Sequence, residues 1–191
     1  MLAKSTLTLA VFTWMAASAL AQQVTLPLPR LLTVMPMGGQ AGTTVEVTIT
    51  GENTENISEL MFSTPKITAK PVAGTENKFT VNIAADAPVG VYDARVMSRL
   101  GVSAARAFSV NKLPEVIRTK ANNSVETAMA LPLGTICNAT MTKRSVDFYA
   151  FQGVKGKRVA VDCAATGIDS RLTPVLILAD AKGGDLKVNR T

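Results

Sequence analysis

The sequence of 191 residues contains no histidine, only two cysteines and one tryptophan, and aromatic residues make up 5% of it. Without histidine there is no Ser-His or Cys-His nucleophile pair and no zinc site with a histidine ligand. Two cysteines are also too few to close a structural zinc site on their own. We therefore expect no catalytic residue, no metal ligand and no bound cofactor, and we predict that the chain is not an enzyme.

Long apolar runs are also scarce, and the one that stands out lies at the N-terminus. Lys4 precedes an apolar stretch over residues 7–19, and Ala19-Leu20-Ala21 gives a small-x-small cleavage pattern. The stretch is shorter than the about 20 residues that a membrane-spanning helix needs. We predict a signal peptide over residues 1–21, with a retained anchor as the alternative. The mature chain is then secreted, periplasmic or on the cell surface, without a membrane span.

Basic residues outnumber acidic ones by 20 to 14, for a net charge of +6. In the second half of the chain they are scattered through predicted turns, and few aromatic residues lie between them. A nucleic-acid site that stacks bases needs such aromatic residues. We therefore interpret the basic residues as solvated turn charge and expect no nucleic-acid partner. The residues concerned are Lys143, Arg144, Lys155, Lys157, Arg158, Lys182 and Lys187.

Apolar and polar residues alternate repeatedly in the first half. In the stretch Thr44 to Thr50, the side chains of Val45, Val47 and Ile49 share one face, as in a half-buried strand. Further strands are predicted over residues 60–63, 67–72, 79–83, 92–96 and 102–110. Short strands separated by glycine turns, with no helical period, predict an immunoglobulin-like β-sandwich over residues 30–111.

The second half reads as another β-module after a linker over residues 112–121, where Pro114 ends the preceding sheet. A short helical turn is expected within 122–130. Strands are predicted over residues 134–141, 148–151, 159–163, 174–179 and 185–188. The strand over 174–179 is apolar on both faces, so we expect it to be central and covered on each side.

The predicted fold class is therefore all-β, with two tandem β-sandwich modules after a signal peptide. Five strands are too few to close the second sandwich, over residues 122–191. We expect this module to be incomplete and the chain to be the N-terminal piece of a longer protein, or an incomplete reading frame.

Cys137 and Cys163 both fall on predicted inward faces of the second module. In an exported protein a disulfide between them would persist. It would close a loop of about 27 residues and stabilise the fold by roughly 3.5 kcal/mol in the chain-entropy model. The alternative is a pair of buried free thiols that act as small hydrophobic side chains.

Five aspartates of the second module are the remaining candidates for a metal site. Calcium takes six to eight oxygen ligands, usually from clustered carboxylates and carbonyls. The spacing of these aspartates is loose, so solvated turn residues are the better interpretation, and we predict no metal site. The residues are Asp147, Asp162, Asp169, Asp180 and Asp185.

Residues 119–191 resemble the bacterial pre-peptidase C-terminal domain, a β-jelly-roll module appended to secreted peptidases. The resemblance rests on Asn122-Asn123, Val146 to Phe151, Lys155 to Arg158, Ile168 to Leu172 and Pro174-Val175-Leu176. The first half, with Pro36 to Gly42 and Ala87 to Tyr92, resembles an immunoglobulin-like module of the IPT/TIG type. Members of the first family usually have acidic residues and a proline before the paired asparagines. Arg118 to Ala121 departs from this pattern, so the resemblance does not imply calcium binding.

Together these features predict a non-catalytic exported protein that serves as an accessory, adhesion or targeting element. Its partner would be an extracellular protein or a polysaccharide. One alternative is the N-terminal part of a secreted peptidase or other hydrolase whose catalytic domain lies beyond residue 191. Another is a calcium-stabilised binding module.

Overall fold

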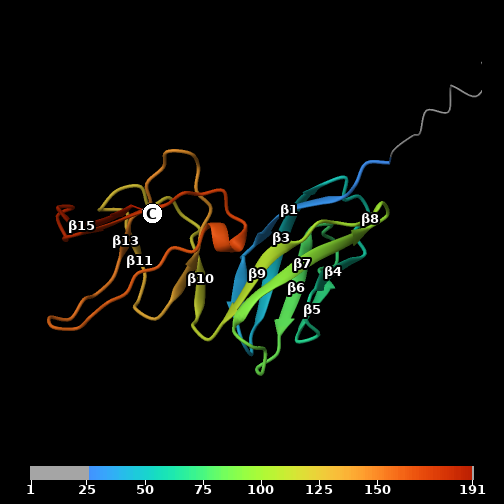
Figure 1. The fold of residues 1–191 in the computed structure, drawn as a ribbon, viewed down its shortest axis with the longest axis horizontal. Coiled ribbons are helices and arrows are strands. Elements are labelled where there is room, and N and C mark those ends of the chain that lie inside the picture. Colours follow the sequence, from blue (N-terminus) through green and yellow to red (C-terminus); the bar gives the residue numbers. More distant parts are fainter. Residues whose placement is uncertain (1–25, 191) are drawn as a thin grey trace, which may run out of the picture.

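The computed structural model describes residues 26–190, so the predicted signal peptide lies outside the described residues. The described chain is all-β apart from one 3-10 turn, η2 (Thr166–Ile168), which confirms the predicted fold class. Figure 1 shows two bodies side by side, a β-sandwich coloured blue to green and a looser region coloured yellow to red. We call residues 26–111 the first module and residues 112–190 the second module.

The first module consists of two facing sheets, one antiparallel and one mixed, whose longer strands follow alternating sequence patterns. One sheet has the order β1-β3-β6-β5, formed by Arg30–Met35, Thr44–Glu52, Lys78–Ile83 and Ile67–Pro71. The other has the order β2-β9-β7-β4, formed by Gly38–Gln40, Arg106–Asn111, Gly90–Ser98 and Glu59–Phe62. In this second sheet β2 runs parallel to β9, and β8 (Gly101–Val102) pairs with β7. The chain passes from the first sheet to the second between β1 and β2, at the cis peptide bond before Pro36.

Side chains from both sheets form one closed core between them. Val47 of β3 and Phe79 of β6 point inward from one sheet, and Phe108 of β9 points inward from the other, each at most 1% exposed. Phe62 lies beside Phe108, with ring centroids 5.0 Å apart. Burying such a side chain stabilises a fold by about 1.5–3 kcal/mol relative to exposure. The alternation predicted from the sequence therefore marks the core of this module.

The strand predicted over residues 102–110 is in fact two strands, β8 and β9. Ser103 causes the break because its Oγ accepts a hydrogen bond from the backbone N of Val96 (3.1 Å) and donates one to the carbonyl of Ala104 (2.8 Å). These local bonds compete with a regular ladder.

The second module contains three separate two-stranded sheets. β10 (Glu115–Ile117) pairs in parallel with β12 (Ile136–Asn138), and β11 (Met129–Ala130) pairs in parallel with β13 (Tyr149–Ala150). β14 (Val175–Ala179) and β15 (Asp185–Arg190) form an antiparallel hairpin. Of the residues described in this module, only Asn122 and Ala165 are buried. The sheets thus share almost no core.

Four expectations for the second module differ in part or in full from the structure. Residues 159–163 form no strand, and Val161 is 59% exposed. Residues 122–130 form no helix, but they contain one hydrogen-bonded turn, in which the Ala128 N donates to the Val125 carbonyl (3.3 Å) and the Thr127 N donates to the Ser124 Oγ (3.3 Å); β11 follows it. The strand predicted over 174–179 exists as β14 but is neither central nor covered on both faces: within residues 26–190 it pairs only with β15, and Val175 and Ile177 are each 53% exposed. Part of the predicted linker, Glu115–Ile117, belongs to β10.

Candidate functional site

The two modules are joined by a polar contact centred on Glu115. Its Oε1 accepts a hydrogen bond from Asn111 Nδ2 (2.7 Å), and its Oε2 accepts one from Asn138 Nδ2 (2.6 Å). Asn138 Oδ1 in turn accepts a hydrogen bond from the backbone N of Met37 (3.0 Å). Asn111 ends β9 and Met37 precedes β2, whereas Asn138 ends β12. We call these four residues the Glu115 clamp, since they tie β10 and β12 of the second module to the β2-β9 edge of the second sheet of the first module.

Burial sets the electrostatics of this clamp. Removal from water raises the pKa of Glu115, while the hydrogen bonds from Asn138 and Asn111 to the carboxylate oppose that rise. A half-buried carboxylate that accepts two amide hydrogen bonds is tolerated because its charge is partly compensated. The four residues of the clamp therefore hold the two modules together through hydrogen bonds, and they do not include a nucleophile next to a base.

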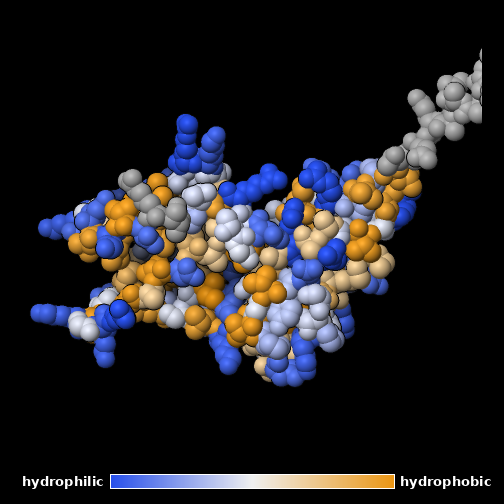
Figure 2. All heavy atoms as spheres, viewed as in Figure 1, coloured by the Kyte–Doolittle hydropathy of each residue, from blue (hydrophilic) through white to orange (hydrophobic). Residues whose placement is uncertain are grey.

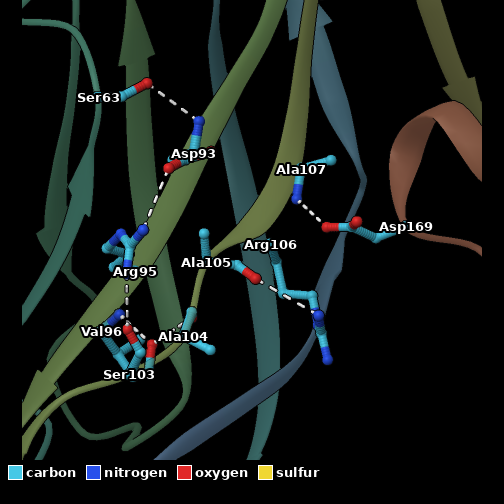
Figure 3. A network of polar contacts seen from close by, with 10 residues as sticks. All are labelled: Ser63, Asp93, Arg95, Val96, Ser103, Ala104, Ala105, Arg106, Ala107 and Asp169. Carbon is cyan, nitrogen blue, oxygen red and sulfur yellow. Dashed lines mark hydrogen bonds and ion pairs between the residues drawn. The ribbon is translucent and has the colours of Figure 1, made fainter.

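A second polar contact between the modules involves Asp169, which follows η2. Its Oδ2 accepts a hydrogen bond from the backbone N of Ala107 in β9 (2.8 Å), as Figure 3 shows. Asp169 has a left-handed backbone (φ 60°), a conformation that aspartate tolerates better than most residues. The conformation lets the loop turn back toward β9. Asp169, one of the five candidate aspartates, thus serves as a tether and not as a ligand.

The interior of the second module holds an ion pair that is largely shielded from water. Arg118 Nε lies 3.2 Å from Asp147 Oδ2, and their side chains are 16% and 9% exposed. The Tyr149 hydroxyl also reaches Asp147 Oδ2 (3.4 Å). Burial raises the pKa of Tyr149 to about 12, so the hydroxyl stays protonated and can donate. Asp147, the second candidate aspartate with a clear role, is a structural partner of Arg118.

The two cysteines are free thiols in the structure, so the predicted disulfide is not formed in it. Cys137 Sγ lies 4.0 Å from Met129 Sδ, a contact between two soft side chains. Burial raises the pKa of the Cys137 thiol and of the Cys163 thiol. Since the thiolate is the reactive form, neither residue is set up as a nucleophile.

The remaining candidate aspartates lie apart from one another. Asp180 Oδ1 accepts hydrogen bonds from the backbone N of Lys182 and of Gly184 (2.8 Å each), which closes the turn between β14 and β15. These bonds lower the pKa of Asp180. Asp162 and Asp185 are exposed. Across residues 26–190 no three acidic or cysteine side chains come together as a metal site.

The outer face of the second sheet of the first module bears a polar network around a shallow hollow. Arg95 Nη2 pairs with Asp93 Oδ2 (3.2 Å), Arg95 Nη1 donates to the Ser103 carbonyl (3.3 Å), and Ser63 Oγ accepts from the Asp93 N (3.0 Å). The hollow measures about 240 Å³ and is lined by Met61, Phe62, Ser63, Asp93 and Arg95. Its polar groups are already engaged with each other, so it offers a ligand few free partners.

A loop over residues 152–161, which we call the basic loop, is an exposed charged segment of the second module. It carries Lys155, Lys157 and Arg158, between Val154 (62% exposed) and Val161 (59% exposed). Lys157 N donates to the Val154 carbonyl (3.0 Å) and Gly156 adopts φ +79°, so the loop tip is a tight turn that needs glycine. The sequence predicts a turn for these bases, but no sequence pattern marks Val154 and Val161 as exposed beside them.

No family model matches this chain, and no curated protein matches it either. The resemblances to pre-peptidase and IPT/TIG modules therefore remain predictions. Within residues 26–190 no helix is long and apolar enough to cross a membrane.

Proposed function

We propose that the protein is a non-catalytic exported binding protein, whose partner is an extracellular protein with an acidic surface. The observation that carries this proposal is the basic loop, in which three cationic side chains stand between two exposed valines. A mixture of apolar and basic side chains on one exposed turn is suited to a protein surface that offers both apolar area and carboxylates.

The distribution of exposed apolar residues supports the second module as the binding part. Figure 2 shows hydrophobic side chains (orange) on its surface beside projecting hydrophilic ones (blue). Large hydrophobic side chains that are exposed outside the strands of this module are Leu113, Val125, Leu133, Met141, Val146, Val154 and Val161. Where such side chains adjoin one another in a contiguous patch, they mark an interaction site.

The exposed apolar side chains of the second module are aliphatic, which favours a protein partner over a polysaccharide. Sugar rings are typically recognised by stacking on exposed aromatic faces, and the aromatic residues of the second module, Phe148, Tyr149 and Phe151, are all half-buried. The exposed side chains are aliphatic. They match the apolar core of a protein interface better than a sugar ring.

The Glu115 clamp and the hydrogen bond from the Ala107 N to Asp169 attach the first module to the second one. A compact sandwich that is fixed to the second module restricts the orientation of the basic loop. A pre-organised loop loses less conformational entropy when it binds than a free one does.

The test is a binding assay with the purified mature chain. Secreted and matrix proteins with acidic surfaces, and acidic and neutral polysaccharides, are immobilised and probed by biolayer interferometry. We expect saturable binding to a protein that weakens with salt, because exposed charges are screened. Lys157→Ala/Arg158→Ala and Val154→Ser/Val161→Ser should each weaken binding at least tenfold.

The matched controls lie on the first module. Val91 and Lys70 are exposed there, and Val91→Ser and Lys70→Ala should leave binding unchanged. Binding to an acidic polysaccharide alone, or binding that ignores the loop variants, contradicts the choice of partner or of surface. Hydrolysis of a peptide or glycan substrate by the chain contradicts the non-catalytic assignment.

A further inference from the structure

The hairpin of β14 and β15 is the longest of the two-stranded sheets in the described part of the chain. It has only two strands, so within residues 26–190 the outer edge of each strand pairs with no other strand. An isolated two-stranded hairpin is marginally stable in water, and a third or fourth strand is normally required. Unpaired backbone N–H and C=O groups along such an edge are a template for another strand.

β14 differs from the other edge strands of four or more residues in carrying neither a charge nor a proline. β4 carries Glu59, β5 carries Lys70 and ends in Pro71, and β1 begins with Arg30. Charges and proline at an edge keep other chains from pairing there. β14 reads Val-Leu-Ile-Leu-Ala, with no charge and no proline, and Val175 and Ile177 are each 53% exposed.

We propose that β14 is a self-association edge, at which two copies of this chain pair antiparallel about a two-fold axis at Ile177. In this register Ile177 faces Ile177 of the second copy, Val175 faces Ala179, and Leu176 faces Leu178. Every cross-strand pair is apolar, and no charge meets another. The two hairpins then form one continuous four-stranded sheet with the β15 strands at its outer edges.

β15 is less suited than β14 to join two copies, because it carries charged residues and β14 carries none. β15 carries Asp185 and Lys187, and antiparallel pairing about Lys187 would place two ammonium groups opposite each other. Like charges that lie directly opposite destabilise a pair of strands. In the β14-paired dimer these residues lie on the outer edges, where charge protects against further growth. The assembly therefore closes at two copies.

The first test is the mass of the mature chain by sedimentation equilibrium from low to high micromolar concentration. We expect a monomer–dimer equilibrium, and we expect Ile177→Lys to remain monomeric throughout because it puts two charges on the two-fold axis. Val161→Lys is the matched control, since Val161 is a similarly exposed residue of the same module outside any strand. Circular dichroism checks that both variants keep the fold.

Three outcomes contradict the proposal. One is a wild-type monomer at every concentration, and another is a dimer that survives Ile177→Lys. The third is open-ended polymer growth, which points instead to head-to-tail pairing of β14 with β15 of the next copy.

The second test probes the register. Ile177→Cys is made in a Cys137→Ser/Cys163→Ser background, with Val161→Cys in the same background as control. Directly opposed antiparallel residues have Cα atoms about 4.5–5.5 Å apart, which is within the range that a disulfide spans. Mild oxidation should cross-link the Ile177→Cys chain into a covalent dimer and leave the Val161→Cys chain uncross-linked. Equal cross-linking of both, or of neither, contradicts the register.

Discussion

The two modules of this chain use similar sequence patterns and reach opposite degrees of burial. In the first module, alternation in β3, β6, β7 and β9 meets a second sheet, and the inward side chains are almost completely enclosed. In the second module, β14 and β15 carry as much apolar character, yet their large side chains remain exposed. Alternating apolar residues thus give a strand a face that can be buried. That face is buried only where a second sheet or a helix packs against it.

The largest loss of stability is expected from truncating a side chain in the core of the first module. Phe108 is fully buried and packs on Phe62, so Phe108→Ala should lower the free energy of unfolding by about 3–5 kcal/mol. Val161→Ala in the second module removes an exposed side chain and should change it by less than about 0.5 kcal/mol. Urea titration followed by far-ultraviolet circular dichroism measures both. Equal losses would mean that the second module has a core like that of the first.

The modules also differ in where their ion pairs lie. Arg118→Met leaves the Asp147 carboxylate shielded and unpaired, and should cost about 3 kcal/mol in urea titrations. Arg30→Met breaks the pair with Glu52 on the surface of the first module, where the side chains are 56% and 53% exposed, and should cost less than about 1 kcal/mol.

A double variant separates the charge from the packing around it. Arg118→Met/Asp147→Leu removes both partners and should recover much of the loss caused by Arg118→Met, because no charge is left without a partner. A double variant no more stable than Arg118→Met would show that Arg118 contributes through packing instead.

Much of the first module could be predicted from sequence, because β3, β6 and β7 alternate over five or more residues. The second module could not be predicted to the same extent, since β11 and β13 have two residues each and pair in parallel across a long separation. Such strands show no measurable period. The Glu115 clamp was missed for a related reason: Glu115 and Asn138 meet only because β10 pairs with β12.

The candidate aspartates illustrate how far sequence reasoning reaches at a site. Their interpretation as turn and surface residues holds for Asp180, which closes a turn, and for the exposed Asp162 and Asp185. The roles of Asp147 and Asp169 depend on Arg118 and on the backbone of Ala107, which are distant in sequence. No local pattern reports such partners.

The joint between the modules should show a distinctive pH dependence. Because the pKa of Glu115 is raised in the folded chain, the folded state binds more protons than the unfolded state from about the ordinary glutamate value of 4.5 upward. Stability contributed by this group is therefore greatest below that value and declines as the pH rises through the folded pKa. Glu115→Gln should flatten the decline in melting temperature across this window. A variant with the same pH profile as the wild type would exclude Glu115 as its source.

The smallest expected effect concerns the thiols, and it distinguishes the structure from the sequence prediction of a disulfide. With Cys137 and Cys163 free, adding a reductant should leave the melting temperature of the purified chain unchanged, and unfolding should expose two thiols to a colorimetric reagent. A disulfide across this loop would instead be worth roughly 3.5 kcal/mol, so reduction would lower the melting temperature by several degrees. Cys163→Ser is the control, because it prevents the bridge without touching the contact between Cys137 and Met129. If reduction destabilises the wild type but not this variant, the second module is held by a covalent bridge that the first module does not need.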